Sequence, residues 1–186
     1  MILEALVTTS DLDGRIHLAP MGPHVEGAEF TRFELRPFPS SQTFQNLKRH
    51  GEGVLHVTDD VLVLARAAIG RIDPPPACEP ASAVRGFVLA DCCRYFEFRV
   101  TATDESHERV RMAAEVVHAG RKRDFFGFNR AKHAVVEAAI LATRTAFLPA
   151  EQIAAEFARL RVLVEKTGGP VEHEAFVLLT EYVRAP

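Results

Sequence analysis

The sequence predicts an α+β protein whose sheet is mostly antiparallel. Short alternating apolar and polar segments, separated by turn residues, dominate residues 1 to about 120, and Ala, Leu and Glu dominate residues 129–185. Strands followed by a run of helices are typical of this class. A chain of 186 residues is long enough for one globular domain with an appendage. We therefore expect a strand-rich domain over residues 1–125 and a helical region over residues 126–186 that packs on it.

The strand-rich part opens with a predicted hairpin over residues 2–18. Its two alternating segments are joined by a turn at residues 11–14, where Gly14 supplies the positive φ that such turns need. Period-2 alternation predicts the later strands, at residues 30–36, 53–58, 87–90 and 95–103. Residues 110–118 stay ambiguous, because their valines favour a strand and the run Met112–Glu115 favours a helix.

Two helices are predicted between these strands. Hydroxyl side chains at residues 40–43 can cap one that ends at Gly51, and Asp59 and Asp60 open the second. In the tail, Asn129 can cap a helix over residues 130–146 with an apolar stripe of Val136, Ile140, Thr143 and Phe147. Pro149 starts the next helix, whose stripe is Ile153, Phe157, Leu160 and Val164, and Gly168–Gly169 ends it before a last helix around residues 175–182.

Composition and spacing exclude several function classes. The net charge is −3, without the excess of Lys and Arg that neutralising nucleic-acid phosphates requires. No apolar run is long enough to span a membrane, and the N-terminus lacks the pattern of a signal peptide. The three cysteines, an odd number, suit a reducing compartment, so we expect a cytoplasmic protein.

Motifs for metal, nucleophilic or nucleotide chemistry do not occur in the sequence. The eight histidines lack metal-ligand spacing, so we expect no metal site. The sequence contains no nucleophile-elbow motif GxSxG, no phosphate-loop motif and no dinucleotide fingerprint.

Two segments together predict an anion site beside a flat ligand. In residues 14–23, small side chains let backbone groups approach a ligand closely. In residues 36–47, a strand ends at Arg36 and a hydroxyl cluster opens a helix. Hydroxyls, free N–H groups at a helix N-terminus and a guanidinium all favour phosphate, although such a cluster also serves as a plain helix cap.

The same segments resemble the FMN-binding split-barrel proteins related to flavin reductases. The resemblance rests on residues 18–22, 43–47 and 51–60. Three further segments, residues 127–132, 142–144 and 165–169, narrow it to the branch of unknown function, archaeal and bacterial, that carries a helical C-terminal region. The chain departs from the reductase pattern at His17 and His56, where that pattern has Asn, and at Ser41 and Gln42, where it has Lys and Asp.

This resemblance implies a split β-barrel that binds FMN as a homodimer. FMN would contact residues of both segments: Ala19, Pro20, Met21, Gly22, Arg36, Ser41, Gln42, Thr43 and Asn46. The family comparison implies FMN binding more firmly than reduction by NAD(P)H, because no segment resembles a nicotinamide site. Asn129, Arg130 and Lys132 either reach the ligand or cap their helix.

Four functions remain open from the sequence. The first is an FMN-dependent oxidoreductase acting on an unknown small molecule. The second is a flavin-binding module without turnover, and the third is an enzyme of pterin or one-carbon metabolism. The fourth is a structural dimer with an empty barrel.

Overall fold

The computed structural model describes residues 1–25, 27 and 29–185, and the chain forms two compact units. The first unit comprises Met1–Thr58 and Pro76–Asp124, and the second comprises Asp59–Pro75 and Phe125–Pro186. The expected division at residue 125 placed residues 59–75 with the strands, but these residues pack with helices instead. None of the described helices is long and apolar enough to cross a bilayer.

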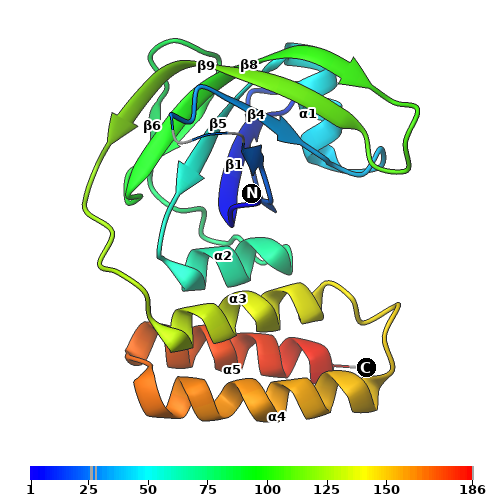
Figure 1. Ribbon diagram of the computed structural model, residues 1–186, viewed down its shortest axis with the longest axis vertical. Helices are drawn as coiled ribbons and strands as arrows, with labels where there is room; N and C mark the ends of the chain where they lie inside the picture. Colours follow the sequence, from blue (N-terminus) through cyan, green and yellow to red (C-terminus); the bar gives the residue numbers. More distant parts are fainter. Residues whose placement is uncertain (26, 28, 186) are drawn as a thin grey trace. The chain divides into compact units, whose positions relative to one another are not determined.

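The first unit contains a seven-stranded antiparallel sheet in the order β2-β1-β5-β8-β9-β4-β3, which curls as Figure 1 shows. Its strands are β1 (Ala5–Ser10), β2 (Ile16–Met21), β3 (His24–Val25), β4 (Arg32–Leu35), β5 (Glu52–Val57), β8 (Arg94–Asp104) and β9 (Arg111–Arg121). β6 (Cys78–Pro80) and β7 (Phe87–Leu89) form a small separate ladder. The predicted α+β class, mostly antiparallel, is confirmed, and the ambiguous segment at residues 110–118 is a strand because it pairs with β8 and β4.

Backbone hydrogen bonds near the N-terminus join the two ends of the curled sheet. Leu3 donates to the carbonyl of Pro23 at 3.2 Å, and Val25 donates to the carbonyl of Met1 at 2.8 Å. Residues 22 and 23 connect β2 to β3 directly, so the chain itself links the two edge strands. The predicted barrel is therefore present, although its closing strand is short.

The barrel interior is filled by apolar side chains. Phe33 and Phe98 meet edge to face, with ring centroids 5.1 Å apart, and Leu55, Phe98 and Met112 are fully buried. Burial of one such side chain contributes about 1.5–3 kcal/mol to stability.

The predicted hairpin and its neighbouring helix are confirmed. In the turn between β1 and β2, Gly14 has φ 77° and the Asp11 carboxylate accepts hydrogen bonds from the N–H groups of Asp13 and Arg15. Helix α1 (Gln42–His50) begins after the cap residue Ser41 and ends at Gly51, whose φ is 66°. Its apolar face contributes Phe44 and Leu47 to the core.

The second unit consists of helices α2 (Val61–Ala68), α3 (Arg130–Ala142), α4 (Ala150–Thr167) and α5 (Pro170–Arg184). The predicted stripe of α4 is buried at Ile153, Phe157 and Val164. The predicted start of α3 at Arg130 after the cap residue Asn129 is confirmed, but its predicted end and apolar stripe were wrong: the helix ends at Ala142, and Phe147 is 83% exposed. Its buried face consists mainly of alanines, because α3 contacts each of the other three helices and small side chains allow close approach.

Candidate functional site

Helix α1 is attached to strands β1 and β2 through polar side chains. Thr43 Oγ1 lies 3.2 Å from Nε2 of His17 on β2. Asn46 Nδ2 donates to Thr9 Oγ1 on β1 at 2.9 Å. The structure therefore brings the two sequence segments that were expected to form one site into direct contact.

Burial separates the predicted residues of α1 into two groups. Thr43 and Asn46 are only 2% and 1% exposed. Asn46 Oδ1 also accepts a hydrogen bond from Gln42 Nε2 at 2.7 Å. Ser41 is half-buried and Gln42 is exposed. Thr43 and Asn46 thus fix the position of the helix, while Ser41 and Gln42 remain accessible at its first turn.

The first turn of α1 favours an anion. Ser41 Oγ accepts from the N–H of Phe44 at 3.2 Å and donates to the carbonyl of Phe38 at 2.8 Å. No described residue accepts from the N–H groups of Gln42 and Thr43, and the described first turn carries no acidic residue. Free N–H groups and the positive end of the helix dipole together attract negative charge.

Strand β2 lies beside this helix and supplies the predicted segment Ala19–Gly22. Of the strands that the structure describes, only β1 pairs with β2, so its outer edge retains backbone donors and acceptors. Ala19 pairs with Val7 and Met21 with Ala5, on the core-facing side of the sheet. A Cβ on Gly22 would lie 3.0 Å from Cγ2 of Ile2, so this glycine serves packing against the N-terminal residues.

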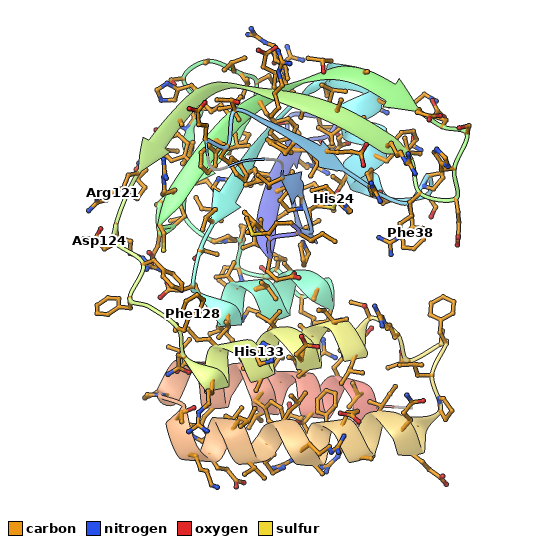
Figure 2. All side chains as sticks on the ribbon, viewed as in Figure 1. His24, Phe38, Arg121, Asp124, Phe128 and His133 are labelled. Carbon is orange, nitrogen blue, oxygen red and sulfur yellow. The ribbon has the colours of Figure 1, made fainter. Side chains whose placement is uncertain are left out.

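Arg36 does not join the hydroxyl cluster. Its Nε donates to Glu34 Oε1 at 2.5 Å, and within the described chain no hydrogen bond connects its side chain to the four predicted residues of α1. Arg36 instead lines a pocket over β3, β4 and β9. The neighbouring Phe38, labelled in Figure 2, is 45% exposed and covered on one face by the Arg109 guanidinium, 4.0 Å from the ring centroid.

His17 also belongs to this site, although from the sequence it was identified only as a departure from the reductase pattern and not as a site residue. Burial lowers the pKa of His17 below its ordinary value, and the nearby Asp11 carboxylate opposes part of that shift. A neutral ring provides one donor and one acceptor nitrogen, which suits a contact with the Thr43 hydroxyl. The sequence offered one signal for this role of His17. The predicted turn after Ser10 sets the register of the hairpin, and that register places His17 opposite Thr9.

The residues around the start of α3 have structural roles. Asn129 Oδ1 caps α3, and its Nδ2 donates to the carbonyl of Thr167 at 3.1 Å. Lys132 Nζ lies 3.1 Å from Glu172 Oε1 and donates to the carbonyl of Asp59 at 2.7 Å. Of the two alternatives for Asn129 and Lys132, the structure favours the helix cap and an ion pair within the second unit.

A curled antiparallel barrel, with an anion-favouring helix next to an edge strand, defines the class of flavin reductase-like split barrels. Solved structures that share this fold include a flavin reductase and a flavoredoxin. The styrene monooxygenase flavin reductase of Pseudomonas putida S12 is 16% identical, with a TM-score of 0.54 over 63% of this chain and 77% of that chain. The flavoredoxin of Desulfovibrio vulgaris (Miyazaki F) is 12% identical, with a TM-score of 0.56 over 64% and 69%.

The chain belongs to the DUF447 family of proteins of unknown function. The model of the family's N-terminal domain matches residues 3–123, and that of its C-terminal part matches residues 129–181. The FMN-bound protein MM1853 from Methanosarcina mazei, of the same family, is 22% identical, with a TM-score of 0.85 over 97% of this chain and 94% of that chain. No protein of curated function matches the sequence. The predicted family is confirmed.

Proposed function

We propose that this protein binds FMN in the first unit, between the start of α1 and the edge strand β2. The observation that carries the proposal is the first turn of α1, with free N–H groups, two accessible polar side chains and no acid. The FMN-bound state of the Methanosarcina mazei relative supports the same cofactor.

The residues present fit both parts of FMN. The N–H groups of residues 42 and 43 and the side-chain amide of Gln42 would hold the phosphate, since these donors suit a dianion. The Ser41 hydroxyl would join them by turning its proton away from the carbonyl of Phe38. The outer edge of β2 around Ala19–Gly22 would pair with the polar rim of the isoalloxazine, which carries both donors and acceptors. Bound FMN would supply electron transfer, and we propose an oxidoreductase acting on a small molecule.

A homodimer would complete this site. The barrel interior is filled by side chains such as Leu55 and Phe98, so the isoalloxazine must lie outside it. A flat ring on the outside requires a cover, and a second copy of the chain would provide one. We place the dimer in the cytoplasm, because Cys78, Cys92 and Cys93 form no disulfide within the described chain, which suits a reducing compartment.

Flavin titration tests the proposal. FMN, FAD and riboflavin are added separately to the flavin-free full-length protein, and flavin fluorescence gives each dissociation constant. We expect FMN to bind most tightly, because the site has a phosphate cluster and no adenylate fingerprint. Equal affinity for FAD, or no uptake of FMN, would contradict it.

Two further measurements test the dimer and the turnover. Light scattering should give about twice the 20.6 kDa chain mass. Anaerobic NAD(P)H should bleach the flavin of a reductase but not that of a binding module.

A further inference from the structure

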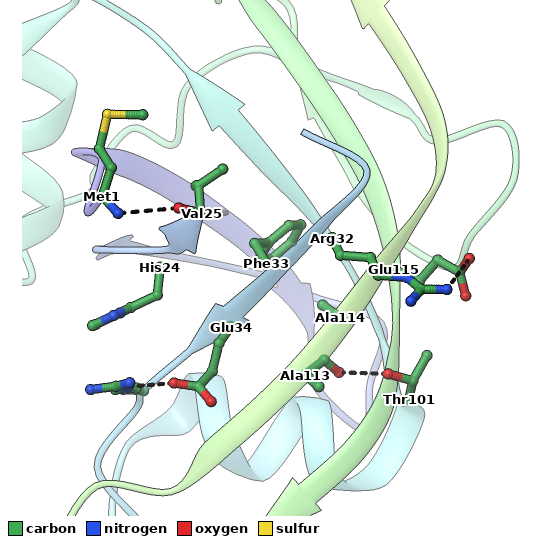
Figure 3. Close-up of a pocket in the computed structure, with 11 residues that line it drawn as sticks. Met1, His24, Val25, Arg32, Phe33, Glu34, Thr101, Ala113, Ala114 and Glu115 are labelled. Atoms are coloured by element: carbon green, nitrogen blue, oxygen red, sulfur yellow. Dashed lines mark hydrogen bonds and ion pairs between the residues drawn. The ribbon is translucent and has the colours of Figure 1, made fainter. Parts of the chain in front are cut away.

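A pocket lies over strands β3, β4 and β9, away from the start of α1, and Figure 3 shows the residues that line it. Its volume is about 590 Å³, within the range of small-molecule sites. The strand register explains why it is hollow. Glu34 lies opposite Ala113, so on this face of the sheet β9 presents a small side chain next to the larger ones of β4. Phe33 and Ala114, one residue along, face the core instead.

Charges in this pocket nearly balance. Glu34 pairs with Arg36, and Glu115 pairs with Arg32 at 3.8 Å. Both carboxylates that line the pocket are therefore engaged by arginines. A ligand with two negative charges would face these carboxylates without enough positive charge to offset them, whereas a monoanion needs only a few free donors.

Free donors remain at two of the lining residues. Arg36 uses Nε for Glu34, and no described residue accepts from its two terminal nitrogens. No hydrogen bond or ion pair engages the His24 ring within the described chain. His24 pairs with Glu34 across the strands, and Arg36 follows Glu34 by two residues, so all three side chains lie on one face of the sheet. In Figure 3 the side chains of His24 and Glu34 extend to the same side.

The apolar residues beside this pocket turn their side chains into the core. Val25 and Phe33 are 4% and 5% exposed and belong, with Ala114, to the core cluster, on the opposite face of the sheet from His24, Glu34 and Arg36. The charged side chains and the small side chain of Ala113 therefore form the accessible lining, which leaves room for a small ligand.

We propose that this pocket binds a small monocarboxylate, its carboxylate held by the terminal nitrogens of Arg36 and one ring nitrogen of His24. A guanidinium whose Nε is fixed by Glu34 presents its two terminal N–H groups as a pre-oriented fork, which matches the two oxygens of a carboxylate. His24 donates from one nitrogen even when the ring is neutral. The site is separate from the proposed flavin site and does not depend on it.

Benzoate is the probe for this proposal, and benzamide is its uncharged control. Each is titrated into the full-length protein, with and without FMN, while NMR follows the backbone amides of Val25, Ala113 and Ala114. We expect benzoate to shift these signals and benzamide to leave them unchanged. Arg36→Gln and His24→Gln should each weaken benzoate about tenfold or more, since each removes a charge-assisted or carboxylate-directed hydrogen bond. Arg159→Gln, the same charge change at an exposed position of α4, should leave it unchanged.

The outcomes separate this proposal from the flavin proposal. Benzoate binding without any FMN binding would support the pocket and contradict the proposed function. Absent shifts in a folded protein, or equal losses in the Arg36 and Arg159 variants, would overturn the pocket. Loss of FMN affinity in Arg36→Gln, together with competition between benzoate and FMN, would also overturn it, because the pocket would then belong to the flavin site. Arg36→Lys, which keeps the charge, replaces Arg36→Gln if that variant fails to fold.

Discussion

His56 Nε2 accepts a hydrogen bond from the backbone N–H of Leu89 at 3.1 Å, and His56 Nδ1 lies 3.3 Å from the carbonyl oxygen of Leu6. The accepting nitrogen carries no proton, so Nδ1 carries it and donates to Leu6. This neutral, fully buried ring joins β5 to β1 and β7. Burial lowers the pKa of His56 to about 4, although the contact with Leu6 opposes the shift.

We predict that the free energy of unfolding decreases as the pH falls from about 6.5 to about 4. The unfolded chain, with a His pKa near 6.5, takes up a proton in this range, and the folded protein does not. The contribution of His56 to the free energy of unfolding is therefore fully present above pH 6.5, and it is lost at about 1.4 kcal/mol per pH unit toward pH 4. Urea unfolding at several pH values measures this slope.

The variant His56→Gln removes the titrating ring. It should be less stable than the wild type at pH 7.5 and show a flatter dependence between pH 5 and 6.5. Part of the slope should remain, because burial lowers the pKa of His17 in the same direction. An unchanged slope in this variant would show that His56 does not titrate in the assigned way.

Glu97 offers a second test, because its buried carboxylate holds the loop at residues 82–84. It accepts hydrogen bonds from the N–H and hydroxyl of Ser82 and from the N–H groups of Ala83 and Val84. Burial alone would raise the pKa of Glu97, but these hydrogen bonds outweigh it and lower the pKa. Glu97→Gln turns an amide toward donors, so we predict a loss of about 3 kcal/mol in chemical unfolding. Glu105→Gln, at an exposed surface pair with Lys48, should change stability by less than about 1 kcal/mol.

Lys132 should be essential to the second unit. Its ammonium neutralises Glu172, whose side chain is only 9% exposed. Lys132→Met leaves that carboxylate buried without its cation, and we predict a loss of about 3–5 kcal/mol by thermal unfolding. The double variant Lys132→Met, Glu172→Gln should recover only part of this loss, because it removes the Glu172 charge but leaves the buried carboxylate of Asp59, which lies 3.7 Å from Lys132 Nζ. A single variant as stable as the wild type would show that the pair is solvated.

A charge placed at the start of α1 tests the phosphate site. Gln42→Glu introduces a carboxylate among the free N–H groups, so FMN affinity should fall about tenfold or more through repulsion. Riboflavin, which lacks the phosphate, should bind as before. Gln152→Glu, an exposed position of α4, is the matched control and should not alter either affinity. Equal weakening of riboflavin would place the defect in the fold instead of the phosphate contact.

Local signals in the sequence predicted the elements that such signals control. Gly14 in the turn between β1 and β2 and Gly51 at the end of α1 lie where they were expected, because both occupy positive φ. The regular spacing of Ile153, Phe157 and Val164 identified the buried face of α4. The alanine face of α3 carried too weak a hydrophobic signal to be recognised. The placement of Arg36 depends on the register of β4 with β3 and β9, which no local pattern encodes. The grouping of α2 with the C-terminal helices depends on long-range packing in the same way.

The two-part composition of the second unit affects the order in which the protein can fold during synthesis. Helix α2 leaves the ribosome early, but the helices that cover its buried residues Val61, Leu64 and Ala65 lie at residues 130–184. At ordinary translation speeds the delay is on the order of ten seconds. Within that time the second segment of the barrel, Pro76–Asp124, also emerges, so the barrel can be complete while α2 is still an uncovered apolar helix between its two segments. The helical unit must therefore form last, and any truncation after the barrel would leave α2 exposed to aggregation.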